Sequence, residues 1–236
     1  MKSTDKISMT ASAFMLQSIR KRYSYNFSWL SRPIIQYPQD IVAFHEIVSS
    51  VKPDLIIETG IAHGGSLVHS ASLLCLLDVM DGIDPRKSLR KVVGVDIDIR
   101  PHNRIAIDEH PLRFKMHLIE GSSIDPHVVS QVRSLATGTK SILVSLDSNH
   151  THDHVFAELT AYADLVSVGS YCIVYDTVID DLPVGSFSDR PWDVGNNPKT
   201  AVCQWLKRHP EFIVDTEIDK KLLISVAPEG YLKRIA

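Results

Sequence analysis

The sequence predicts a Rossmann-like α/β fold, with a mostly parallel sheet, helices on both of its faces and a C-terminal antiparallel hairpin. Short apolar runs alternate with segments of helical periodicity over most of the 236 residues. This alternation is typical of βαβ units, whose strands pair in parallel and are covered by the intervening helices. The length fits one domain with an extension. Acidic residues follow several of the apolar runs, where an open α/β sheet binds its ligands.

An N-terminal arm is expected over residues 1–40, because this part is first polar and then amphipathic, and two prolines interrupt any helix. The main domain then covers residues 41–236. Its first helix is predicted by the spacing of apolar residues, namely Ile41, Phe44, Ile47 and Val48. The apolar run that follows ends at Glu58 and indicates a buried strand.

The remaining elements follow in order along the chain. Helices are expected over about residues 65–80, 102–109, 124–135, 152–165 and 199–209. Strands are expected in the runs "KVVGVDID", "KMHLIEG", "SILVSLD" and "SYCIVYD". Near the C-terminus, "EFIVDT" and "KLLISVA" are separated by the polar "EIDK" and are expected to pair as the hairpin. The segment 179–198 is the one long irregular stretch.

Charge and hydropathy exclude two classes of partner. The net charge is −3 and the basic residues are dispersed, so the sequence predicts binding neither to nucleic acid nor to an anionic membrane. No N-terminal apolar stretch reads as a signal peptide, and no run approaches the roughly 18 apolar residues of a spanning helix. A cytoplasmic protein with a small-molecule substrate is expected.

Acidic residues end four of the expected strands. They are Glu58, Asp96, Asp147 and Asp176. A single strand-end acid often does no more than cap the next helix. Four of them at one edge of a parallel sheet instead favour a ligand site.

The turn "ETGIAHGGS" after the first strand is rich in glycine, which lets the backbone turn tightly and a ligand approach closely. It is not a GxGxxG motif, since residue 62 is alanine, and the next strand-end acid comes too late for a dinucleotide fingerprint. A nicotinamide cofactor is therefore disfavoured. An acid, a glycine-rich turn and a second strand-end acid match the pattern of folds that bind S-adenosylmethionine (SAM).

This pattern assigns candidate cofactor contacts. Glu58 and the turn, with Gly60, Gly64 and Ser66, would take the amino-acid end of SAM. Asp96 would accept hydrogen bonds from both ribose hydroxyls, as the lone pairs of a carboxylate allow. The segment after the third strand would lie beside the adenine through Ser122 and Ser123, although a helix cap is the alternative for it.

Asp147 and Asp176 end neighbouring strands and predict a metal site. Two carboxylates that leave coordination positions open suit Mg²⁺, which keeps several waters and binds substrate oxygens. Thr177, which follows Asp176 directly, is the candidate third ligand, with Asp180 and Asp181 as alternatives in the loop beyond.

The stretch "HTHDH" contains three alternate histidines, His150, His152 and His154. It is one residue short of the HxHxDH of zinc hydrolases and has no matching second histidine group, so zinc hydrolysis is disfavoured. An iron oxygenase with two histidines and one carboxylate is conceivable. Such sites usually lie in double-stranded β-barrels, which this alternation of helices and strands does not predict.

The motifs "LIIETGIAHGGSLVHSASLL", "VVGVDIDIR", "LDSNHTHDHVFAEL", "GSYCIVYDTVIDD" and "NNPKTAVCQWLKRHPEFIVD" resemble the cephalosporin hydroxylase or rhamnosyl O-methyltransferase family from about Tyr25 onward. The resemblance implies a class I methyltransferase that uses SAM and a metal. Asp147 and Asp176 match the family's metal ligands, and Tyr175 stands where some relatives have a glutamate ligand. His150 matches the catalytic base of related macrolide-sugar methyltransferases, whereas His152 and His154 are expected to line or cap the next helix.

These observations together predict a SAM- and metal-dependent O-methyltransferase that acts on a hydroxyl of a sugar or glycosylated metabolite. Relatives and the amphipathic arm suggest a homo-oligomer. Two alternatives remain open at this point. One is a metal-dependent oxygenase, and the other is a non-catalytic cofactor-binding subunit in which Tyr175 marks lost chemistry.

Overall fold

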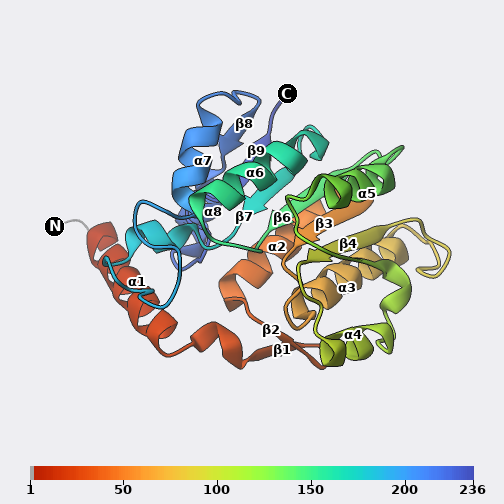
Figure 1. Ribbon diagram of the computed structural model, residues 1–236, viewed down its shortest axis with the longest axis horizontal. Helices are drawn as coiled ribbons and strands as arrows, with labels where there is room; N and C mark the ends of the chain where they lie inside the picture. Colours follow the sequence, from red (N-terminus) through yellow and green to blue (C-terminus); the bar gives the residue numbers. More distant parts are fainter. Residues whose placement is uncertain (1–2) are drawn as a thin grey trace.

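The computed structural model describes the backbone of residues 3–236 and the side chains of residues 6–236. Within them, a seven-stranded sheet has the order β5-β4-β3-β6-β7-β9-β8 (Figure 1). The parallel strands are β3 (Leu55–Thr59), β4 (Lys91–Asp96), β5 (Met116–Glu120), β6 (Ile142–Leu146) and β7 (Tyr171–Val174). The strands β8 (Phe212–Val214) and β9 (Tyr231–Arg234) are antiparallel. The predicted mostly parallel α/β sheet is thus confirmed.

Helices cover both faces of the sheet (Figure 1). One face carries α2 (Pro38–Val51) and α3 (Gly65–Met80), with α4 (Pro101–Asp108) beside them. The other carries α5 (Pro126–Ala136), α6 (His152–Tyr162) and α7 (Pro198–Leu206). Successive strand residues point to opposite faces, so Ile56 packs with α2 and α3 while Leu55 and Ile57 pack with the other helices. Burial on both faces explains why β3 and β6 read as continuous apolar runs.

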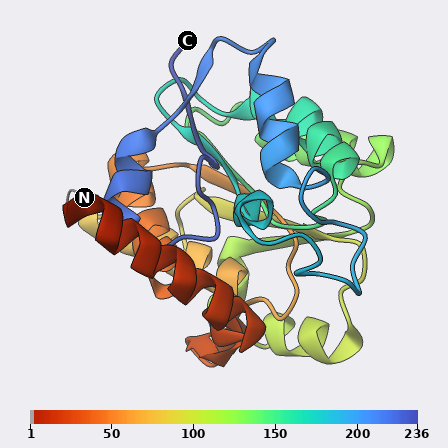
Figure 2. The same cartoon turned by 90° about the vertical axis from the view of Figure 1, so that its left-hand side faces the viewer.

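The N-terminal part comprises α1 (Ser3–Arg20), a 3₁₀ turn (Tyr23–Asn26) and a hairpin of β1 (Phe27–Trp29) and β2 (Arg32–Ile34). Figure 2 shows α1 as a long helix lying across the molecule. Met15 of α1 packs against Tyr37 and Val178, and the Ser18 and Tyr37 hydroxyls are 2.7 Å apart. This helix therefore contacts the chain just beyond the carboxyl end of β7.

The prediction that "KLLISVA" forms the second strand of the hairpin is wrong. Residues Thr216–Leu222 form a helix, α8, and β8 pairs instead with β9, which lies between β7 and β8. The Asp215 side chain accepts the backbone N–H of Glu217 and caps α8, so the polar "EIDK" expected to link two strands is helical, and residues 223–227 of "KLLISVA" are irregular. Tyr231 and Leu232 are completely buried and fill opposite faces of the sheet, so β9 satisfies both cores.

Other differences concern the ends of elements. The helix expected over residues 152–165 ends at Tyr162 and continues as a 3₁₀ turn, η3 (Ala163–Leu165). Two further 3₁₀ turns are η2 (Arg113–Lys115) and η4 (Thr177–Asp181), the latter opening the long irregular segment. Among residues 3–236, no helix is both long and apolar enough to cross a membrane.

Candidate functional site

The glycine-rich turn between β3 and α3 lies against the end of β6. Gly60 has φ +89°, and a Cβ built on it would lie 2.0 Å from the carbonyl oxygen of Asp147. Gly64 has φ +83°, and its Cβ would meet the side chain of Ile107 at 2.6 Å. Residue 60 therefore needs glycine for conformation and for space, and residue 64 needs it for conformation.

Glu58 lies below this turn, almost completely buried. The Ser66 hydroxyl donates a hydrogen bond of 2.6 Å to its carboxyl group, and the Ser70 hydroxyl donates a weaker one of 3.5 Å. Burial raises the pKa of Glu58 to about 7, with the two serines opposing the rise. Glu58 can therefore exchange a proton near neutral pH when a cationic group approaches.

Asp96 ties the turn to the end of β4. One of its carboxylate oxygens accepts the backbone N–H groups of Ile61 at 2.7 Å and Ala62 at 2.9 Å, and the other accepts that of Asp98 at 3.1 Å. The residue remains partly exposed. Its carboxylate thus orients the turn and keeps a face open to solvent.

Ser122 and Ser123 follow β5 beside this acid, because the preceding Gly121 donates its N–H to the Asp96 carbonyl. Ser122 is partly exposed. Ser123 is buried, and its hydroxyl lies 3.0 Å from Nε2 of His154. The hydroxyl of Ser123 is therefore engaged within the protein, whereas that of Ser122 is accessible.

The structure brings Asp147, His150 and Asp176 together at the ends of β6 and β7. One ligand atom from each lies within 4.8 Å of the others, and His150 Nε2 is 3.2 Å from Asp176 Oδ2. Burial raises the pKa of Asp147 well above its usual value, and the negative charge of Asp176 adds to the rise. Two close carboxylates with oxygen ligands are the donors that Mg²⁺ prefers, and a cation there would relieve their repulsion.

The other candidate metal ligands are engaged elsewhere. The Thr177 hydroxyl is buried and donates to the Pro228 carbonyl at 2.7 Å. Asp180 accepts from Asn197 at 2.6 Å, and Asp181 pairs with Lys199 at 2.8 Å. Thr177 thus anchors η4 to the loop before β9, and Asp180 and Asp181 hold the long segment against the start of α7.

Two of the three histidines lie outside the cluster of Asp147, His150 and Asp176. His152 Nδ1 is 2.8 Å from the Thr200 hydroxyl, which joins α6 to α7. His154 Nε2 contacts the hydroxyls of Ser123 and Ser148 at 3.0 and 3.2 Å. Only His150 therefore faces the two carboxylates, and the described residues do not assemble two histidines and one carboxylate as an iron oxygenase would need.

The long irregular segment passes over this cluster. The Trp192 ring meets the His150 ring edge-on, with centroids 4.6 Å apart. The Arg190 guanidinium lies over the Trp192 ring, 5.5 Å from its centroid. An aromatic side chain thus borders the open side of the cluster, which sequence patterns did not indicate.

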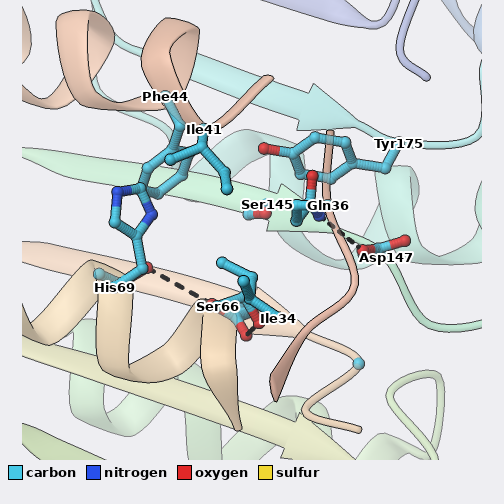
Figure 3. A pocket seen from close by; sticks show the side chains of 12 residues that line it. Ile34, Gln36, Ile41, Phe44, Ser66, His69, Ser145, Asp147 and Tyr175 are labelled. Carbon is cyan, nitrogen blue, oxygen red and sulfur yellow. Dashed lines mark hydrogen bonds between the residues drawn. The ribbon is translucent and has the colours of Figure 1, made fainter. Parts of the chain in front are cut away.

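A pocket connects the turn with the cluster (Figure 3). Its cavity volume is about 20 Å³, roughly the room that one water or one small polar group needs. Glu58, Gly60 and Asp147 line it, together with Gln36 and Tyr175. Figure 3 shows Gln36, Asp147 and Tyr175 on one side and Ile41, Phe44 and His69 on the other. Gln36 belongs to no motif, so nothing in the sequence signals its position.

Comparison with known proteins places these features in a family. A family model described as "Rhamnosyl O-methyltransferase/CmcI" matches residues 21–235. A rhamnosyl O-methyltransferase of Mycobacterium tuberculosis is 29% identical over 197 residues, which cover 83% of this chain and 73% of that protein.

Solved structures share the fold. A structure described as CmcI with Mg and SAM has a TM-score of 0.59 and 19% identity, and the match covers 90% of this chain and 78% of that one. CalS11, described as a TDP-rhamnose 3′-O-methyltransferase, has a TM-score of 0.51 and 15% identity, with 87% of each chain covered.

Proposed function

Because the chain belongs to the rhamnosyl O-methyltransferase/CmcI family of SAM-dependent O-methyltransferases, we propose that it methylates a sugar hydroxyl in a Mg²⁺-dependent reaction. The observation that carries the proposal is the convergence of Asp147, His150 and Asp176 beside the Glu58–Gly60 turn. Cofactor and acceptor would then meet at one edge of the sheet.

The cofactor would lie along the carboxyl ends of β3, β4 and β5. Glu58 and the turn, through Gly60, Gly64 and Ser66, would hold its amino-acid end. Asp96 would accept hydrogen bonds from the ribose through the exposed part of its carboxylate. Ser122 would contact the adenine, and Ser123 would support Ser122 through its bond to His154.

Asp147 and Asp176 would hold the metal ion. A bound Mg²⁺ supplies positive charge that makes an acceptor hydroxyl more acidic and orients it. Thr177 stays a candidate further ligand, because its hydroxyl oxygen keeps lone pairs while it donates to Pro228. His150 Nε2 lies 3.2 Å from Asp176 Oδ2, within the same group of ligand atoms as the two carboxylates.

His150 would act as the general base. It would accept the hydroxyl proton as the oxygen attacks the methyl group, and the C–S bond of the sulfonium breaks to leave neutral S-adenosylhomocysteine. Trp192, in contact with His150, would border the sugar ring. Rhamnose is the first acceptor to test, because the mycobacterial relative and CalS11 are both described as acting on it.

A symmetric homo-oligomer is also proposed. Ile7 and Phe14 on α1 are 51% and 39% exposed and, seven residues apart, lie on one face of the helix, and uncovered apolar residues on one face favour contact with a second copy. Light scattering coupled to gel filtration tests this.

The decisive assay incubates the protein with methyl-labelled SAM, Mg²⁺ and either TDP-rhamnose or methyl α-rhamnoside. Transfer of label to the sugar is expected, with one S-adenosylhomocysteine formed per product. SAM binding without transfer to either sugar would favour a non-catalytic subunit. Oxygen consumption coupled to acceptor hydroxylation would favour the oxygenase.

A further inference from the structure

Gln36 links the N-terminal part of the chain to the candidate metal ligand Asp147. It lies between β2 and α2 and is only 7% exposed. Its side-chain amide donates from Nε2 to Oδ2 of Asp147 at 3.1 Å (Figure 3). The neighbouring Ile34 and Tyr37 are 2% and 1% exposed, so the backbone on both sides is held by packing.

The other end of the same amide has no partner. Oε1 of Gln36 is buried and accepts no hydrogen bond from the described residues. A buried acceptor without a donor is costly, and native proteins rarely leave one so. Because Gln36 lines the pocket beside Glu58 and Ser66, the group that satisfies Oε1 can come from a ligand in that pocket.

The chemistry around Oε1 selects the kind of ligand. The nearby carboxyl groups of Glu58 and Asp147 are acceptors when ionised, and Gln36 adds a neutral acceptor. A primary ammonium group, which has three N–H donors and a positive charge, matches this set. The α-ammonium of the cofactor's amino-acid end is such a group, and the glycine-rich turn that would hold this end lines the same pocket.

We propose that Gln36 accepts a hydrogen bond from the α-ammonium of the cofactor through Oε1 while its Nε2 holds Asp147. This inference rests on the proposed function and adds a positioning residue from the N-terminal part of the chain. One planar amide, bonded at both ends, would connect the cofactor to a metal ligand. Cofactor binding should therefore tighten Mg²⁺ binding, and Mg²⁺ should tighten cofactor binding by the same factor.

Titration calorimetry with two ligands tests whether Gln36 binds the amino-acid end of the cofactor. S-Adenosylhomocysteine carries the amino-acid end, and 5′-methylthioadenosine lacks it but keeps adenosine and sulfur. Gln36→Leu is expected to lower the affinity for S-adenosylhomocysteine about 10–100-fold, as loss of a bond to a charged group implies. Its affinity for 5′-methylthioadenosine should stay within about twofold of the wild-type value. Gln39→Leu is the matched control, because Oε1 of Gln39 is also buried without a partner but does not line the pocket.

The coupling between the cofactor and Mg²⁺ is tested by titrating Mg²⁺ with and without S-adenosylhomocysteine. The wild type and Gln39→Leu should bind Mg²⁺ more tightly when the nucleoside is present, and Gln36→Leu should lose this coupling. Gln36→Met, which keeps the length of the side chain, replaces Gln36→Leu if thermal unfolding shows that the latter is not folded.

The outcomes separate this inference from the proposed function. Unchanged binding of S-adenosylhomocysteine in the Gln36 variants, or equal weakening of both ligands, would overturn the role of Gln36 alone. Failure of the wild type to bind S-adenosylhomocysteine would overturn the proposed function as well.

Discussion

His150 Nε2 lies 3.2 Å from Oδ2 of Asp176, so the first of the three alternate histidines meets the carboxylate that ends the neighbouring strand. His152 and His154 bond instead to hydroxyls that hold α6 in place. The three residues are close in sequence and of one type, yet only one reaches the cluster. This difference makes the roles of the histidines testable one by one.

His150→Ala should lower the rate of methyl transfer at saturating substrates by about 10²–10⁴-fold, the usual contribution of a general base. The affinity for S-adenosylhomocysteine should not change. His152→Ala is the control, because its ring bonds to Thr200 outside the cluster. If His150→Ala keeps its rate and only weakens Mg²⁺ binding, His150 is a metal ligand and not the base.

Asp176→Asn should weaken Mg²⁺ binding by more than tenfold and reduce turnover accordingly, since it removes one of few charged ligands. Removal of the metal by a chelator should stop methyl transfer by the wild type. Asp189→Asn serves as control, because Asp189 lies in the long irregular segment beyond, with its side chain 82% exposed. Full activity in the presence of the chelator would show that Asp147 and Asp176 have only structural roles.

Asp96→Ala should weaken the binding of S-adenosylhomocysteine by about 1.5–3 kcal/mol, because hydrogen bonds to a charged acceptor are lost. It should weaken the binding of 5′-methylthioadenosine as well, because both ligands carry the ribose. Asp98→Ala provides the comparison, since calorimetry should find its affinity for both ligands unchanged. Unchanged affinity of the Asp96 variant for 5′-methylthioadenosine would show that Asp96 does not bind the ribose.

Cofactor affinity should rise with pH between about 5.5 and 8. Burial raises the pKa of Glu58 to about 7, so the carboxyl is largely protonated at the lower pH. The ammonium group binds the ionised form better, which means that binding releases a proton and strengthens as pH passes the pKa. Calorimetry of Glu58→Gln with S-adenosylhomocysteine should show a much flatter profile. An equally steep profile in that variant would assign the proton to another group.

Asp40→Asn tests how a buried carboxyl affects stability. Asp40 is fully buried and accepts from the Ser225 and Tyr231 hydroxyls and from the Val226 N–H. Burial raises its pKa from 3.8 to about 6, so the folded state binds more protons than the unfolded state between these values.

The contribution of Asp40 therefore favours folding below about pH 4 and is lost as pH rises through about 6. As pH rises between those limits, the free energy of unfolding of the wild type should fall by up to roughly 3 kcal/mol relative to that of Asp40→Asn. Urea unfolding of both proteins at pH 4.5 and pH 7.5 measures this difference. A constant difference in unfolding free energy would show that Asp40 does not titrate in this range.

Features that depend on short stretches of sequence were predictable. The alternation of apolar runs with helical periods located β3 to β7, and the strand-end acids followed directly, because burial on both faces of a parallel sheet forces apolar residues along the whole strand. Family membership followed from motifs such as the glycine-rich turn, where Gly60 meets the end of β6 too closely for any other residue.

Features that depend on packing between distant segments needed the folded structure. "KLLISVA" has the composition of a strand, but only its first two residues are regular, as the end of the helix that Asp215 caps, and Tyr231 and Leu232 of β9 fill the place beside β7. Gln36 has no local signal, since its role arises only when the N-terminal segment meets Asp147. Periodicity records which face of an element is buried, whereas hydrogen bonds between side chains depend on how those elements meet in space.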